Sequence, residues 1–210
     1  MPDAGRVITG TAKGVVLRGA GEGTRALSDR VKQALFASLE SELDDVWPVP
    51  LLDLFAGSGA VGIEALSRGA PRVVFVERSP DAARVIAENL RRARLDGGEI
   101  VRGDALRYLE RGLGADAAAA TATPGPAPFG VAVIDPPYAD AAALEASLVQ
   151  LGDPALGWLR DDAVVVAKHF WRDAPPERVG DLRRDRLRRF GETALTFYRR
   201  DVVAKGRPET

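Results

Sequence analysis

Four consecutive residues, Asp135-Pro136-Pro137-Tyr138, combine hydrogen-bond acceptors with a flat ring. The prolines have no N–H group and favour extended geometry, so the loop presents two acceptors, the Asp135 carboxylate and the Pro136 carbonyl oxygen. Two acceptors can orient an exocyclic NH₂ group, and the Tyr138 ring can stack on the base that carries it. The pattern predicts a catalytic loop (Asp135, Pro136, Pro137, Tyr138) for the amine of an unpaired or flipped nucleobase. Such a transfer requires no metal.

A second pattern is a glycine-rich loop between an expected strand and an expected helix. Gly57, Gly59 and Gly62 fit the dinucleotide fingerprint G-x-G-x-x-G, and Glu77 follows 20 residues after Gly57. Glycines there let backbone approach a ligand, and the helix start offers free N–H groups. The Glu77 carboxylate could accept hydrogen bonds from ribose hydroxyls. The loop therefore predicts a nucleoside-containing ligand at the carboxyl ends of the strands.

Asp53, directly before this loop, discriminates between two ligands. A carboxylate there repels the pyrophosphate of a nicotinamide dinucleotide, whereas it attracts the ammonium and sulfonium groups of S-adenosylmethionine. We therefore expect S-adenosylmethionine as the cofactor. Asp104 could accept a hydrogen bond from the adenine amine, cap the following helix, or do both. The expected cofactor-binding residues are Asp53, Phe55, Ala56, Gly57, Ser58, Gly59, Glu77, Arg78, Asp104 and Ala105.

Short apolar strands alternate with helices through most of the chain. We expect strands at 51–54, 73–76, 100–101, 131–134 and 164–167, and helices at 60–68, 80–94, 106–111 and 141–151. Such alternation predicts an α/β fold with a mostly parallel sheet and helices on both faces. Residues 115–128 read as a low-complexity loop insertion with no assigned function.

Three further elements flank this alternation. Residues 6–18 predict a β-hairpin, so we divide the chain into an N-terminal extension, 1–24, and a main domain, 25–210. A helix should begin at Ser28, because Ser28 is a good N-cap with Asp29 beside it. The apolar residues that follow recur every four positions, which indicates one helical stripe. A final hairpin is expected at 187–190 and 194–198. The helix stripe consists of Val31, Leu35, Leu39 and Leu43.

Composition excludes several classes of protein. The chain has 210 residues, a net charge of −1 and no cysteine, which rules out disulfides and thiolate metal sites. With neither a signal-peptide pattern nor a long apolar run, a cytoplasmic location is expected. Basic residues cluster locally: six Lys/Arg against three acidic residues in 1–32, and eight arginines against three in 178–200. These clusters could contact phosphates.

Taken together, the motifs resemble bacterial 16S rRNA (guanine-N2)-methyltransferases of the RsmD type, within the class I (Rossmann-like) methyltransferase fold. The resemblance covers almost the whole chain. The Glu-Ala-Leu-Ser-Arg-Gly-Ala run is its most specific part, whereas the loop at 135–138 is shared with DNA amino-methyltransferases. The matching segments are Arg6–Gly10, Lys13-Gly14, Ser28–Lys32, Leu35-Phe36, Asp53–Gly59, Glu64–Ala70, Asp135–Tyr138, Gly191–Thr193 and Tyr198.

The resemblance implies a seven-stranded sheet, S-adenosylmethionine as donor, and a guanine of 16S rRNA in a small-subunit particle or assembly intermediate as acceptor. It also implies that the N-terminal hairpin grips RNA and that Ser28, Asp29 and Arg30 border the cofactor pocket. The RNA-binding candidates are Arg6, Lys13, Arg18 and Arg25. We expect a monomer.

Two positions depart from the family pattern. Ala26-Leu27-Ser28 stands where the family usually has Pro-Thr-Thr, which loosens one edge of the pocket. Lys168-His169 stands where the family tends to carry an acidic residue. The sequence assigns Lys168 no role. His169 is interpreted as a surface or strand-end residue, because amine methylation needs no imidazole base.

Three alternatives remain. A DNA adenine-N6 or cytosine-N4 amino-methyltransferase would share the acceptor loop, but no large domain for reading duplex sequence is present. An NAD-dependent oxidoreductase would use the glycine loop and Glu77 but leaves residues 135–138 unexplained. A non-enzymatic RNA-binding assembly factor would need neither Asp53 nor Asp135.

Overall fold

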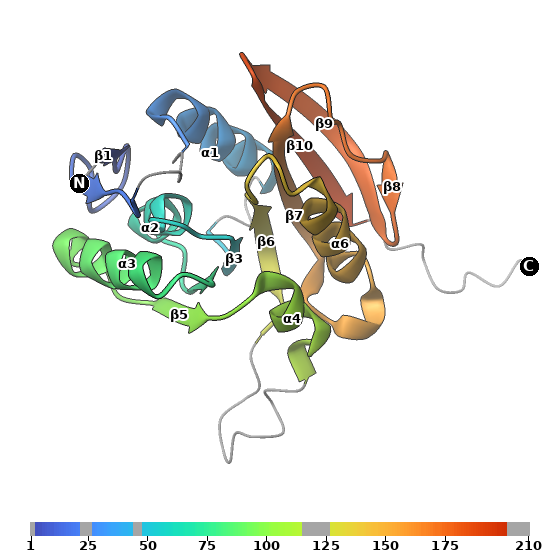
Figure 1. The fold of residues 1–210 in the computed structure, drawn as a ribbon, viewed down its shortest axis with the longest axis horizontal. Helices are drawn as coiled ribbons and strands as arrows, with labels where there is room; N and C mark the ends of the chain where they lie inside the picture. Colours follow the sequence, from blue (N-terminus) through green and yellow to red (C-terminus); the bar gives the residue numbers. More distant parts are fainter. Residues whose placement is uncertain (1–2, 22–26, 44–47, 115–126, 201–210) are drawn as a thin grey trace, which may run out of the picture.

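An eight-stranded sheet forms the centre of the molecule in a computed structural model that describes residues 3–21, 27–43, 48–114 and 127–200. The strand order is β5-β4-β3-β6-β7-β10-β9-β8; β5 through β7 are parallel, and β10, β9 and β8 continue antiparallel (Figure 1). The strands are β3 (Leu51–Leu54), β4 (Val73–Glu77), β5 (Gly98–Arg102), β6 (Phe129–Ile134), β7 (Leu159–Phe170), β8 (Arg178–Val179), β9 (Leu182–Phe190) and β10 (Thr193–Arg200).

The expected α/β class and mostly parallel sheet are confirmed, but the sheet has eight strands instead of seven. The additional strand is β8, whose two residues pair with Leu182 and Arg183 at the edge. Several strands are longer than expected, because polar residues at their ends continue the ladder beyond the apolar stretch.

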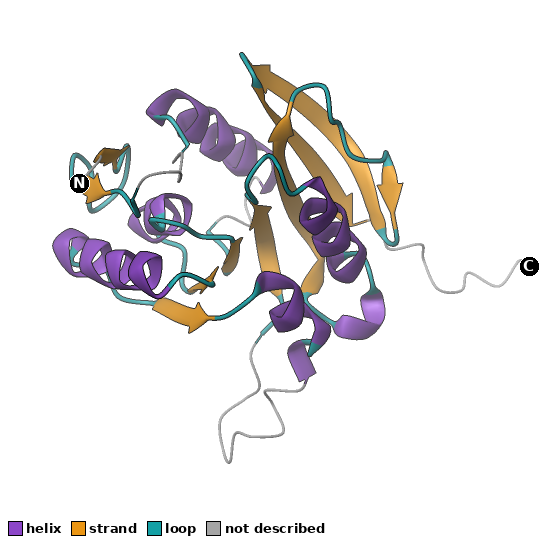
Figure 2. Cartoon of the chain, viewed as in Figure 1, coloured by secondary structure: helices purple, strands orange, loops and turns teal. Residues whose placement is uncertain are grey.

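Helices cover both faces of the sheet (Figures 1 and 2). Helices α1, α2 and α3 pack on one face, and α4 and α6 pack on the other. No described helix is long and apolar enough to cross a membrane. Residues 115–126 of the expected insertion lie outside the described residues. The helices are α1 (Asp29–Leu43), α2 (Ala60–Ser67), α3 (Pro80–Ala93), α4 (Ala105–Glu110) and α6 (Ala141–Leu151), with a 3₁₀ turn, η2, at Pro154–Leu156.

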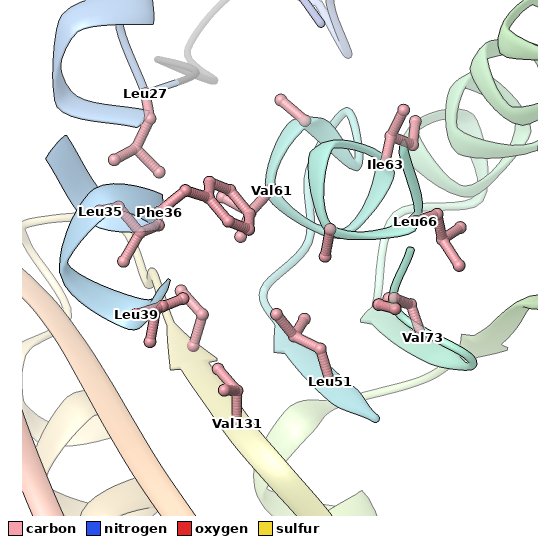
Figure 3. Packing of buried hydrophobic residues seen from close by; sticks show 14 of the residues in the cluster. Leu27, Leu35, Phe36, Leu39, Leu51, Val61, Ile63, Leu66, Val73 and Val131 are labelled. Atoms are coloured by element: carbon pink, nitrogen blue, oxygen red, sulfur yellow. The ribbon is translucent and has the colours of Figure 1, made fainter. Parts of the chain in front are cut away.

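The predicted stripe on α1 is buried and supplies much of the core on its face. Leu35, Phe36 and Leu39 are fully buried near Val61 of α2 and Leu51 of β3 (Figure 3). This packing fixes α1 on one face of the sheet, so that Val31, near its start, borders the site described below.

The third glycine of the fingerprint serves packing. A Cβ atom on Gly62 would lie 2.2 Å from Cε1 of Phe75, so only glycine lets α2 approach β4 this closely. Gly62 is therefore explained by the fold, whereas Gly57 belongs to the site.

The N-terminal hairpin consists of β1 (Asp3–Arg6) and β2 (Val16–Arg18), which pair antiparallel. Its first strand lies earlier than the expected Val7-Ile8. Val7 and Leu17 are buried in the core, so the hairpin packs against the main domain. The proposed boundary at residue 24 lies outside the described residues.

Glu64 of α2 anchors this hairpin. Its fully buried carboxylate accepts hydrogen bonds from the backbone N–H groups of Ile8 (2.7 Å) and Thr9 (3.0 Å). It also pairs with the buried Lys32 ammonium at 3.6 Å and with Arg68 Nε at 2.8 Å. Four donors from three segments converge on one carboxylate, which gives the Glu64–Ala70 run a structural role.

Replacement of Glu64 by alanine should destabilise the fold strongly. Burial already lowers the pKa of Lys32, and Glu64 opposes that shift, so the variant leaves a buried cation without its carboxylate. Breaking a buried pair in this way costs about 3–5 kcal/mol, equivalent to a fall in Tm of about 10 °C for a chain of this size. Thermal unfolding followed by circular dichroism measures it.

Glu88→Ala is the matched control, because its ion pair with Arg18 also links the hairpin to a helix but is exposed. Exposed pairs contribute about 0–1 kcal/mol. Equal Tm values for the two variants would contradict the anchoring role of Glu64.

Candidate functional site

A cleft of about 590 Å³ opens at the carboxyl ends of the parallel strands. Each of four neighbouring strands contributes one carboxylate to its wall: Asp53 of β3, Glu77 of β4, Asp104 after β5 and Asp135 after β6. Most of the predicted site residues line this single cleft, namely Asp53, Phe55, Ala56, Gly57, Ser58, Glu77, Arg78, Asp104, Ala105, Asp135, Pro136, Pro137 and Tyr138.

The glycine loop reaches the cleft through left-handed backbone. Phe55, Gly57 and Gly59 have φ values of 60°, 56° and 76°. That conformation suits glycine, but it costs Phe55 of the order of 1–3 kcal/mol, the kind of strain found at ligand-binding turns. Gly59 does not line the cleft: it begins α2, and a Cβ there would lie 3.1 Å from Ile86.

Glu77 supports this loop from the next strand. One carboxylate oxygen accepts the Gly57 N–H at 2.8 Å, and the other accepts the Ser79 N–H at 2.8 Å. Each oxygen retains a lone pair, because a carboxylate has about four acceptor positions. Glu77 can therefore hold the loop and still accept from a ligand hydroxyl.

Asp53 is buried under the loop, and its Oδ2 accepts the Gly62 N–H at 3.0 Å. Burial raises the pKa of Asp53 well above its usual value, and the nearby Asp135 and Glu77 raise it further. A cation placed beside Asp53 would offset the cost of ionising it. The cleft thus favours a positively charged ligand.

Asp104 caps α4: its Oδ1 accepts hydrogen bonds from the backbone N–H groups of Leu106 and Arg107, both at 3.1 Å. The capping interpretation is confirmed. The side chain is exposed and faces the same cleft, so contact with an adenine amine stays a prediction.

Lys168 of β7 is the residue that sequence reasoning missed. Its ammonium lies 2.5 Å from Oδ1 of Asp135 and 5.0 Å from the centre of the Tyr138 ring. Burial raises the pKa of Asp135, and the Lys168 ammonium opposes that shift. The parallel register explains the pairing, because Ile134 lies opposite Ala167, which places the next residue of each strand side by side.

A second, smaller pocket of about 230 Å³ adjoins the cleft. Leu27, Tyr138 and Lys168 line both, so the two spaces meet at these side chains. The Tyr138 hydroxyl lies 2.7 Å from Thr193 Oγ1, and this hydrogen bond holds the Tyr138 ring between the two spaces. The second pocket is lined by Leu27, Ser28, Val31, Tyr138, Lys168, Glu192 and Thr193.

Some predicted residues lie elsewhere. Ser28 lines the smaller pocket only, and neither Asp29 nor Arg30 lines either space. Asp29 instead pairs with Arg6, at 3.4 Å. Among the RNA-binding candidates, Arg6, Lys13 and Arg18 are exposed on the hairpin, and Arg25 lies outside the described residues.

His169 is buried, so the surface interpretation was wrong, although it does lie near the strand end. Its ring nitrogens lie 2.7 Å from the Phe170 carbonyl oxygen and 2.8 Å from Thr196 Oγ1, and burial lowers its pKa. Its role is therefore to hold β7 against β10. No group of three or more potential metal ligands occurs in the part of the chain that the structure describes.

Comparison with known proteins gives a consistent result. The family described as "Conserved hypothetical protein 95" matches residues 5–199. The "Putative rRNA methyltransferase YlbH" of Bacillus subtilis is 36% identical over 197 residues, covering 93% of this chain and 98% of that protein. The "Ribosomal RNA small subunit methyltransferase D" of Escherichia coli K12 is 28% identical over 181 residues, covering 86% and 81%.

A solved structure is similar as well. It is titled "Putative methyltransferase yhhF from Escherichia coli", with a TM-score of 0.77, 26% identity, and coverage of 95% of this chain and 99% of that one.

Proposed function

The chain belongs to the Conserved hypothetical protein 95 family and is an rRNA methyltransferase that uses S-adenosylmethionine, and on that premise we propose that it methylates the exocyclic N2 amine of a guanine in small-subunit rRNA. The observation that carries the proposal is the ion pair between Asp135, which lines the cleft, and Lys168, which lines both the cleft and the smaller pocket. We further propose that the cleft holds the methyl donor, that the smaller pocket receives the base, and that the enzyme acts in the cytoplasm.

The charges of the cleft suit the donor. Five carboxylates line it against two cations, Arg78 and Lys168, and the most deeply buried carboxylate is Asp53. S-adenosylmethionine supplies a methyl group on a sulfonium and carries an ammonium near it. A dinucleotide would bring a pyrophosphate to the same carboxylates, which disfavours the oxidoreductase alternative.

Binding of the donor should depend on pH through Asp53. A cationic ligand favours the ionised carboxylate, so affinity for S-adenosylmethionine should fall as pH decreases through the raised pKa of Asp53. S-adenosylhomocysteine lacks the sulfonium charge and should lose less affinity over the same range. Calorimetric titrations of both ligands across pH measure the difference, and identical pH profiles would contradict the assignment.

The acceptor side is complementary to guanine. The Watson–Crick edge of guanine presents an N2 amine donor, an N1–H donor and an O6 acceptor in a row. Asp135 Oδ2 and the Pro136 carbonyl oxygen are acceptors for the two donors, and the Lys168 ammonium, bonded to Oδ1, has protons left for O6. Adenine and cytosine present an acceptor beside their amine, which would face the carboxylate.

The chemistry then requires a base at one atom. Transfer forms an N–C bond and breaks the S–C bond, and the amine must lose one proton. Asp135 Oδ2 has no hydrogen-bond partner among the described residues, and burial raises the pKa of this carboxyl, so it can take that proton. Lys168 holds the carboxylate in place, and Tyr138 stacks on the base.

Lys168→Met tests the recognition of O6. The variant keeps the volume of the side chain but removes the donor, so kcat/KM for rRNA should fall about 10–100-fold, as for a polar group left unpaired. The Kd for S-adenosylmethionine should stay within the same order of magnitude. Partial recovery in Lys168→Arg would support donation to O6, whereas wild-type activity of Lys168→Met would exclude it.

Tritium transfer to three substrates tests the proposed function itself. Deproteinised small-subunit rRNA, assembled small subunits and duplex DNA should be compared in parallel. We expect label in at least one RNA arm and none in DNA. Label in duplex DNA would favour the DNA amino-methyltransferase alternative, and absence of label from all three would favour the binding-only alternative.

A further inference from the structure

Three aromatic side chains form a continuous series that starts at the base pocket and leads away from it. The Tyr138 and Phe170 rings lie 6.4 Å apart with an interplanar angle of 65°, and the Phe170 and Trp171 rings lie 6.2 Å apart. Tyr138 is 39% exposed, and the other two rings are partly exposed. Partly open rings at the mouth of a base pocket offer surfaces on which neighbouring bases can stack.

Two arginines extend the series. The guanidinium carbon of Arg189 lies 3.5 Å from the centre of the Trp171 ring, and that of Arg172 lies 4.8 Å from it. Both arginines are exposed. A guanidinium that stacks on indole keeps its outer face for a base and its remaining N–H groups for phosphate.

The β9–β10 turn holds this cluster in place. The backbone N–H of Trp171 donates to the Glu192 carbonyl oxygen at 3.0 Å, and Arg189 Nε donates to the Gly191 carbonyl oxygen at 2.9 Å. Thr193, which pairs with Phe170, lies beside the Tyr138 hydroxyl. The same turn therefore positions both the inner and the outer end of the series.

Charge along β9 points to the same kind of ligand. The strand carries five arginines in nine residues: Arg183, Arg184, Arg186, Arg188 and Arg189. Arg184 and Arg186 pair with Glu177 and Glu42, whereas Arg188 and Arg189, at the end nearest the base pocket, have no acidic partner among the described residues. The local charge is positive in a chain whose net charge is −1.

We propose that Tyr138, Phe170, Trp171, Arg172 and Arg189 form an aromatic–arginine track that binds single-stranded RNA flanking the target guanine. The inference rests on the proposed function and assigns it a second contact surface, separate from the N-terminal hairpin. Single strands fit this surface because their bases expose the faces that stacking needs, whereas a duplex hides them. Nucleotides next to the flipped base would stack on Trp171 while Arg172 and Arg189 contact the backbone.

Trp171→Ala, Trp171→Phe and Arg189→Gln test the track in the full chain. The probe is a fluorescein-labelled single-stranded RNA of about ten nucleotides, within the site sizes known for stacking grooves. Trp171→Ala should raise the Kd for this RNA and the KM for rRNA about tenfold, while kcat and the Kd for S-adenosylmethionine stay unchanged. Trp171→Phe keeps a stacking ring and should bind nearly as wild type does. Arg189→Gln should weaken binding and reduce its dependence on salt.

Arg84→Gln is the matched control, because Arg84 is an exposed arginine on α3, away from the track. Wild-type RNA affinity in Trp171→Ala would overturn the proposal. Failure of the proposed function is distinguishable: wild-type protein that binds the RNA through Trp171 but transfers no methyl group would refute the function and leave the track standing. Methylation of rRNA with an unchanged KM in Trp171→Ala would refute the track and leave the proposed function standing.

Discussion

Asp135→Asn should lower kcat for rRNA methylation about 10³-fold, in the range expected when a positioned proton acceptor is removed. The physical reason is the Lys168 ammonium, which lies 2.5 Å from Asp135 Oδ1 and needs a hydrogen-bond acceptor at that position. The asparagine oxygen will turn toward Lys168, so its NH₂ group will face the substrate amine, donor against donor. The variant loses both the proton acceptor and the orienting contact.

The effect should be confined to the chemical step. Asp135 lines the cleft beside Lys168, which also lines the smaller pocket. The carboxylate that favours the cationic donor is principally the more deeply buried Asp53, so the Kd for S-adenosylmethionine should change little. Single-turnover kinetics with bound donor separate the two quantities. Asp153→Asn is a suitable control, because that residue is an exposed helix cap outside both pockets. A wild-type kcat in Asp135→Asn would remove Asp135 from the mechanism.

Asp53→Asn should weaken S-adenosylmethionine binding about 100-fold, equivalent to about 3 kcal/mol for a charge-assisted contact in a buried site. The asparagine oxygen can still accept the Gly62 N–H, so the loop should keep its shape. S-adenosylhomocysteine should lose less affinity, because it has no sulfonium charge to be stabilised. Calorimetry with both ligands measures the ratio.

The same substitution should make the ligand-free protein more stable at neutral pH. The folded-state pKa of Asp53 is raised above its unfolded value, so the native state holds the proton more tightly. Ionisation of this carboxyl therefore reduces stability as pH rises above its usual pKa, and the cost is present at pH 7. Asp53→Asn removes that cost and should raise Tm. Asp96→Asn, at an exposed loop position, should change neither Tm nor the affinity for S-adenosylmethionine.

A less stable Asp53→Asn protein with normal donor affinity would contradict both expectations. The combination that we expect, weaker binding with a more stable fold, is what a functional carboxylate held at a cost to the fold should produce.

The parallel part of the sheet was predictable because its strands are short, apolar and buried on both faces. The sequence indicated β3, β4 and β6 to within one or two residues. The strand β7 was expected at 164–167 but extends over Leu159–Phe170, because Asp161 and Asp162 are exposed and continue the strand with polar side chains. The length of the antiparallel strand β9 was underestimated for the same reason: it was expected at 187–190 but begins at Leu182, and it consists largely of arginines.

The site was predictable where one short segment supplies the chemistry, as in the glycine loop and residues 135–138. It was not predictable where two segments meet. Lys168 is 33 residues from Asp135, and only the parallel register of β6 and β7 brings them together. Glu64 was recognised as part of a motif, but its hydrogen bonds to the hairpin depend on how α2 packs.

The identity of the methylated nucleoside tests the account most directly. Small-subunit rRNA from a strain lacking this protein should be incubated with the enzyme and S-adenosylmethionine that carries a trideuterated methyl group. The rRNA is then digested to nucleosides and analysed by mass spectrometry. We predict the trideuterated methyl on N2-methylguanosine alone, with Asp135→Asn abolishing it. Label on N6-methyladenosine or N4-methylcytidine, or no label in any nucleoside, would contradict a guanine amine held by Asp135 and Lys168.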